Sequence, residues 1–106
     1  MAYLYVTEYA DLSRDAKGNL VMCGQEPAIA RYRIAIGAES AKGPSLQART
    51  RFVHVTPDVV CSYVLERSAE AEATEDDTRL PADSERWFGV PPGDANAYAV
   101  AVVENV

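Results

Sequence analysis

Apolar and polar residues alternate with a period of two along most of the chain, which is typical of β-strands rather than helices. Between residues 28 and 36 the even positions are apolar or aromatic, whereas Arg31 and Arg33 occupy odd positions. The stretch 3–9 is rich in tyrosine and branched residues, which favour strands. The pattern predicts a strand in each stretch, the one over 28–36 with an apolar face and a basic face.

Turn-forming residues separate the remaining predicted strands, with the strongest turn at residues 91–94. These strands are expected over 20–22, 46–56, 59–65, 85–90 and 97–103. Beyond Phe52 the apolar positions change parity, which predicts a β-bulge or burial on both faces. The stretch 59–65 is apolar on both parities, which predicts a central strand.

About seven to eight short strands without an amphipathic helix predict an all-β fold, a small antiparallel β-sandwich or jelly-roll-like barrel. The length of 106 residues predicts one domain over 1–106, with both terminal strands joined to the sheets. Residues 38–45 and the acidic stretch 66–77 are expected to be loops, the latter solvated.

The composition restricts the partners. Hydrophobic residues make up 48% of the chain and charged residues 25%, which is ordinary for a soluble protein. No apolar run is long enough to cross a membrane, and the N-terminus lacks the features of a secretory signal. A net charge of −6 with few lysines disfavours nucleic-acid binding. We therefore expect neither a membrane nor a nucleic-acid partner.

Residues with catalytic or metal-binding chemistry are few. His54 is the only histidine, and neither Ser45 nor Ser62 lies in a nucleophile-elbow context, so we interpret His54 as structural. The cysteines form no metal-binding or redox motif; Cys61, inside an apolar run, is expected to be a buried free thiol, and a bond to Cys23 is left open. The acidic stretch lacks EF-hand spacing. We expect no enzymatic activity, no metal and no cofactor.

Two groups of side chains are candidates for contact with a partner. Four arginines lie on the polar parity of two predicted strands and would converge if those strands were neighbours. Such a face is either solvated and paired with carboxylates or a docking face for an acidic protein surface. A tyrosine ladder including Tyr9 could pack across strands or form a stacking platform. The candidate contact residues are Tyr3, Tyr5, Arg31, Arg33, Arg49, Arg51, Trp87 and Phe88.

A series of short motifs occurs in a fixed order along the chain. They are Thr7-Glu8-Tyr9, Gly18-Asn19, Glu26-Pro27-Ala28, Ile34-Ala35-Ile36-Gly37, Arg51-Phe52-Val53-His54-Val55, Cys61-Ser62 and Phe88-Gly89-Val90-Pro91-Pro92-Gly93. In this order the chain resembles a group of small proteins encoded among the virion genes of tailed bacteriophages and prophages. The resemblance extends over roughly residues 5–93 and matches neither the acidic insert at 66–78 nor Trp87.

The resemblance implies a virion structural protein without catalytic residues, most plausibly a capsid decoration (cement) protein that binds the major capsid protein and stabilises the shell. Such a protein is made in the host cytoplasm, ends on the capsid surface and acts as a homo-oligomer. Two alternatives stay open: a tail or head–tail joining component, and a non-viral carbohydrate- or peptide-binding β-sandwich module.

Overall fold

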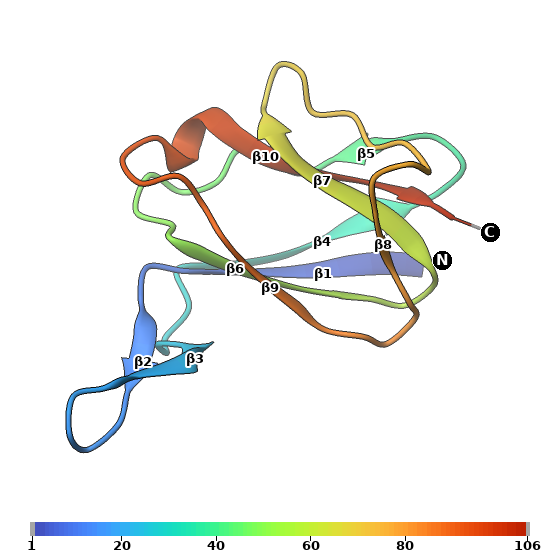
Figure 1. The fold of residues 1–106 in the computed structure, drawn as a ribbon. Helices are drawn as coiled ribbons and strands as arrows, with labels where there is room; N and C mark the ends of the chain where they lie inside the picture. Colours follow the sequence, from blue (N-terminus) through green and yellow to red (C-terminus); the bar gives the residue numbers. More distant parts are fainter. Residues whose placement is uncertain (1, 106) are drawn as a thin grey trace.

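The computed structural model describes residues 2–105, apart from the side chain of Met22, and in this range the chain is all-β. Two antiparallel four-stranded sheets pack face to face as a small β-sandwich, which confirms the predicted fold class (Figure 1). In spatial order, the first sheet contains β4 (Ala30–Ile36), β1 (Ala2–Tyr9), β6 (Phe52–Pro57) and β9 (Arg86–Gly89). The second contains β5 (Ala41–Lys42), β10 (Tyr98–Glu104), β7 (Cys61–Arg67) and β8 (Thr78–Leu80).

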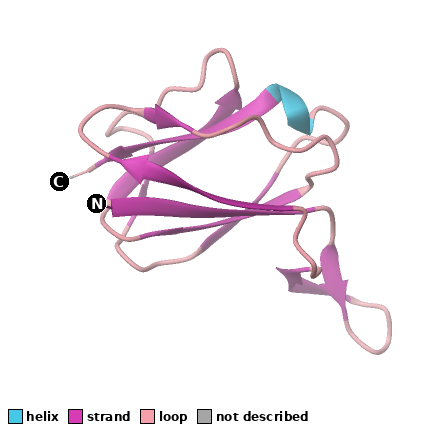
Figure 2. Cartoon of the chain, turned by 180° about the vertical axis from the view of Figure 1, so that it is seen from behind, coloured by secondary structure: helices cyan, strands magenta, loops and turns pink. Residues whose placement is uncertain are grey.

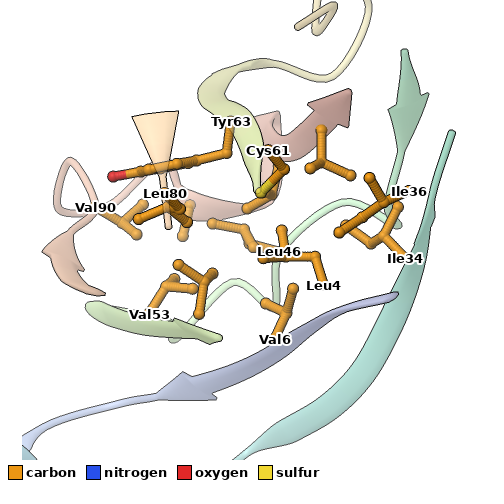
Figure 3. Close-up of a cluster of buried hydrophobic side chains, with 14 residues drawn as sticks. Leu4, Val6, Ile34, Ile36, Leu46, Val53, Cys61, Tyr63, Leu80 and Val90 are labelled. Carbon is orange, nitrogen blue, oxygen red and sulfur yellow. The ribbon is translucent and has the colours of Figure 1, made fainter. Parts of the chain in front are cut away.

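The core lies between the two sheets and follows the alternation seen in the sequence. Leu4 and Val6 of β1 are buried, whereas Tyr5 between them is exposed. Val53 from the first sheet and Val100 from the second meet them with no exposed surface, as the close-up in Figure 3 illustrates for much of this cluster. Each fully buried aliphatic side chain of this kind stabilises the fold by roughly 1.5–3 kcal/mol.

The terminal strands both join the sheets as predicted, β1 in the first and β10 in the second. A short 3-10 helix, η1 (Ala95–Ala97), leads into β10. The prediction of a strand over 46–56 is wrong for residues 46–51, because the regular strand β6 begins only at Phe52. The short strands β5 and β8 have too few residues to show a periodic pattern.

Residues 46–51 instead cross from one sheet to the other. The Leu46 N–H donates to the Tyr98 carbonyl of the second sheet, and the Arg51 N–H donates to the Tyr9 carbonyl of the first. Leu46 is only 2% exposed and points into the core from this crossing segment (Figure 3). The apparent change of parity is therefore no bulge: within β6 the burial alternates regularly.

The outer face of the second sheet is covered by part of the acidic stretch. The strand β7 lies between β10 and β8, which confirms the predicted central position. Residues 68–77, here called the acidic strap, cross the outer face of the second sheet. In this segment Ala71 and Ala73 pack against Ala101 and Val103. Most carboxylates of the strap face solvent as predicted, but Ala71 and Ala73 do not, because their small side chains let the backbone lie close to the sheet.

A two-stranded hairpin, here called the arm, projects from the sandwich. It consists of β2 (Leu12–Arg14) and β3 (Leu20–Gly24), and both views show it standing away from the two sheets, at the end opposite the start of β1 (Figures 1 and 2). Asp15 orders the predicted turn by accepting the N–H groups of Lys17 and Asn19 on its side chain, and Gly18 has a φ of +84°.

Candidate docking surface

Aromatic and arginine side chains gather on the outer face of the first sheet. The register places Arg33 of β4 beside Tyr5 of β1, and His54 of β6 beside Trp87 of β9. Since buried residues alternate with these along each strand, the remaining side chains point outward on the same side. We call this surface the aromatic–arginine face and define it by Tyr3, Tyr5, Tyr9, Arg31, Arg33, His54 and Trp87.

One half of this face is built from tyrosines and a guanidinium. The rings of Tyr3 and Tyr5 are 6.3 Å apart between centroids, and the guanidinium carbon of Arg33 lies 4.1 Å from the centroid of Tyr3. A cation over an aromatic ring is attracted by the ring quadrupole, so Tyr3 holds Arg33 in place. Arg33 forms no ion pair with any described residue, and Tyr5 is 44% exposed.

The other half holds Trp87 between two neighbours. Its ring centroid lies 4.6 Å from that of His54 and 5.4 Å from that of Tyr9. His54 Nε2 lies 2.9 Å from Glu85 Oε1, which fixes the imidazole against the indole. These contacts restrict the rotation of Trp87. The site therefore presents a large aromatic side chain in a fixed orientation.

A shallow depression of about 300 Å³ lies between β1 and β4, lined by Tyr5, Thr7, Arg31 and Arg33 among others. Arg31 Nη2 lies 3.1 Å from Glu26 Oε2, and both side chains of this pair are more than half exposed. An ion pair so exposed contributes little free energy, since water and salt compete for both groups. The arginines beside the depression are thus accessible to a carboxylate from another molecule.

The structure brings together five of the eight predicted contact residues: Tyr3, Tyr5, Arg31, Arg33 and Trp87. The condition for the convergence of the four arginines, that their strands are neighbours, is not met, because β1 lies between β4 and β6 and because Arg49 and Arg51 belong to the crossing segment. Phe88 points the other way, toward the core, where it stacks on Tyr63 at 5.5 Å between centroids.

A buried polar cluster behind the face was not singled out from the sequence. Glu8 is 1% exposed, and its Oε1 accepts hydrogen bonds from the Gln47 N–H at 2.8 Å and the Thr50 hydroxyl at 2.6 Å. The hydroxyl of Tyr32 is buried without a hydrogen-bond partner among the described residues. Burial and the nearby Glu8 carboxylate raise the pKa of Tyr32. The parity of Glu8, which it shares with the buried side chains of β1, is the signal that could have located it.

The other chemically reactive residues lie apart from this cluster. Cys61 is a buried free thiol, as predicted, and burial raises its pKa to about 11. Cys23 is a free, exposed thiol on the arm, so the structure has no bond between them. Among the described residues no group of three or more histidine, cysteine or acidic side chains is arranged to hold a metal ion.

The fold and the aromatic–arginine face together define a small antiparallel β-sandwich with one exposed, ordered aromatic surface. No family model, curated protein or solved structure matches the chain. Within residues 2–105, no helix is long and apolar enough to cross a membrane.

Proposed function

We propose that this chain is a non-enzymatic virion structural protein of the tailed-phage type, most specifically a capsid decoration protein that binds the major capsid protein. The observation that carries the proposal is the aromatic–arginine face, which presents tyrosine, tryptophan and arginine side chains on one sheet. These residue types are enriched in protein–protein interfaces and in their energetic hot spots. The assignment to virion proteins is based on the order of the sequence motifs, through which the chain resembles small virion proteins of tailed phages.

The chain would strengthen a shell by binding across the boundaries between its subunits. A standard interface buries about 800 Å² on each partner, a small part of the 6083 Å² that the chain exposes. Because Trp87 and Arg33 are already held by neighbouring side chains, little side-chain entropy is lost on docking. Many copies, or a homo-oligomer with several faces, would add avidity to modest individual contacts.

The test uses particles of the phage or prophage that encodes the chain, prepared with and without this protein. Gel densitometry of purified particles measures its copy number. Hundreds of copies support the shell, whereas six or twelve copies indicate the neck or tail and overturn the decoration role. Heating both kinds of particle adds a functional measurement: we expect the decorated shells to rupture at a higher temperature. Equal rupture temperatures at full occupancy would contradict cementing.

Matched variants connect the binding to the face. Tyr5→Ala and Arg33→Ala remove exposed side chains of the face, and we expect each to weaken cosedimentation with particles by about thirtyfold, the effect of a hot-spot residue that contributes about 2 kcal/mol. Arg79→Ala removes an arginine from β8 of the second sheet that is also exposed, and it serves as the control. Equal behaviour of Arg33→Ala and Arg79→Ala would contradict docking through the aromatic–arginine face.

A carbohydrate-binding module is the second candidate, and the adjacent tyrosines Tyr3 and Tyr5, of which Tyr5 is 44% exposed, favour it. Their rings lie 6.3 Å apart between centroids and are inclined at 56° to each other, so each ring could stack against a different sugar. A glycan array separates the two candidates: saturable binding of a glycan that is lost in Tyr5→Ala would support this one. Particle binding without any glycan binding would exclude it.

A further inference from the structure

The strand β4 forms an edge of the first sheet and pairs only with β1. The Tyr3 carbonyl accepts a hydrogen bond from the Asp58 N–H just after β6. Because the backbone groups of successive residues in a strand point to opposite sides, the odd residues of β1 bond toward β6 and its even residues bond toward β4. The even residues of β4 therefore pair with β1. The backbone groups of Arg31, Arg33 and Ala35 point away from the sheet, and no backbone hydrogen bond connects them to another strand.

This edge is accessible. Arg31, Arg33 and Ala35 are exposed. The neighbouring residues Ile34 and Ile36 point the other way and are buried in the sandwich. An edge strand with free N–H and C=O groups is a template for the backbone of another extended chain. The seven residues of β4 are enough for several such hydrogen bonds on alternate residues.

The charge of the edge selects among the possible occupants. Arg31 and Arg33 flank it on the outer side of the sheet, at positions two apart. A second copy that paired its own β4 about a central two-fold axis would set Arg33 directly opposite Arg33, and like charges opposite each other destabilise a strand pair. Carboxylates at the same positions would instead meet guanidiniums within reach of bidentate hydrogen bonds. The edge therefore disfavours its own copy and favours an acidic strand.

We propose that β4 accepts an extended acidic segment of the docking partner as an additional strand of the first sheet. The backbone of the segment bonds to Arg31, Arg33 and Ala35, and its carboxylates, at alternate positions, lie beside the two arginines. Alternate residues of a strand are about 7 Å apart on both sides of such a pair, so an acidic–x–acidic pattern matches the arginine spacing. This inference rests on the proposed docking function and names the partner segment that the site recognises.

Arg31 and Arg33 are both available to bind the carboxylates of the partner segment. Tyr3 already orients Arg33, which has no ion-pair partner among the described residues. Arg31 can leave Glu26 at small cost, because both groups of that pair are largely in solvent.

The probe is a capped peptide as long as β4, in which Glu alternates with Val or Thr. Titrated into the isotopically labelled chain, it should shift the amide resonances of Arg31, Arg33 and Ala35 in a saturable manner, and more weakly at high salt. Two control peptides isolate the two parts of the recognition. The first carries Lys in place of Glu, and the second is N-methylated on alternate residues so that it cannot pair its backbone. We expect neither to bind.

Charge-reversed variants supply the matching test on the protein. Arg33→Glu should weaken binding of the acidic peptide at least tenfold, whereas Arg79→Glu on the second sheet should not. The double variant Arg31→Glu/Arg33→Glu should bind the Lys peptide instead, which a misfolded protein could not do. Equal binding of the N-methylated and unmodified peptides would overturn strand addition. Equal effects of the reversals at Arg33 and Arg79 would overturn the site.

Two further outcomes separate this inference from the docking proposal. If the chain self-associates through β4 and Arg33→Glu changes only that association, the occupant is a second copy and the inference is wrong. If particles bind the chain through the aromatic–arginine face but the acidic peptide does not bind, the docking proposal stands and only the edge inference fails. Absence of particle binding with intact peptide binding contradicts the docking proposal instead.

Discussion

The orphan hydroxyl of Tyr32 makes a sharp prediction about stability. Its oxygen is buried without a hydrogen-bond partner among the described residues. Leaving such a group unpaired costs about 1–3 kcal/mol relative to hydration in the unfolded chain. Tyr32→Phe keeps the ring and removes the hydroxyl, so we expect this variant to be more stable than the wild type at pH 7, by about 1 kcal/mol.

The advantage of Tyr32→Phe should grow with pH. Burial, and after it the charge of Glu8, raises the pKa of Tyr32 above the ordinary value of 10.0. Below pH 10 both states of the wild type keep the proton, and stability is unaffected. Above pH 10 the unfolded chain loses the proton and the folded chain retains it, so folding stability falls by about 1.4 kcal/mol per pH unit. The difference between variant and wild type should therefore reach roughly 2.5 kcal/mol at pH 11.

Urea unfolding at pH 7, 10 and 11, followed by the fluorescence of the single tryptophan, measures this difference. The raised pKa of Cys61 also reduces alkaline stability, but it does so in both proteins and cancels. Tyr5→Phe, which removes an exposed hydroxyl, is the control and should change stability little at each pH. A variant–wild-type difference that stays constant from pH 7 to pH 11 would refute the reasoning.

Two other predictions concern the arm and the thiols. Gly24→Ala would place a Cβ inside the Tyr9 ring, so we expect the free energy of unfolding measured in urea to fall by about 1–3 kcal/mol and the tryptophan fluorescence to change. Gly37→Ala, which has open space at its Cβ, is the control and should be nearly neutral. Equal losses in the two variants would contradict the packing of Gly24 on Tyr9. A thiol reagent should modify Cys23 rapidly and Cys61 only after unfolding, because burial shields Cys61 and raises its pKa to about 11. One fast-reacting thiol in buffer and two in denaturant is the expected count, and two fast-reacting thiols in buffer would contradict the buried position.

The local alternation of residues was sufficient to predict the longer strands, but not the short strands β2, β5 and β8. In β4 it correctly assigned which residues point to the core, because side chains on a strand alternate whatever the strand pairs with. It failed for 46–51, where Leu46 is buried by a crossing segment and only imitates a strand position. A local pattern does not distinguish these cases.

Which residues lie together in the candidate site depends on the order of the strands in the sheet, and a local sequence pattern does not contain that order. The order of strands in a sheet is set by contacts between residues far apart in sequence, so the sequence pattern could not show that β1 separates β4 from β6. That order removed Arg49 and Arg51 from the predicted arginine face. It also brought His54 and Trp87 together, a contact for which the sequence carried no signal.

The arm meets the sandwich where its two ends come together, and Gly24 of the arm also packs against the ring of Tyr9. The Gln25 N–H donates to the Asp11 carbonyl at 2.9 Å, so the chain leaves and re-enters at adjacent positions. A hairpin of another length or sequence, or a tight turn, could be grafted between these two residues without redirecting the strands on either side. The length of the arm is thus independent of the register of the two sheets, provided that the residue beside the Tyr9 ring stays as small as Gly24.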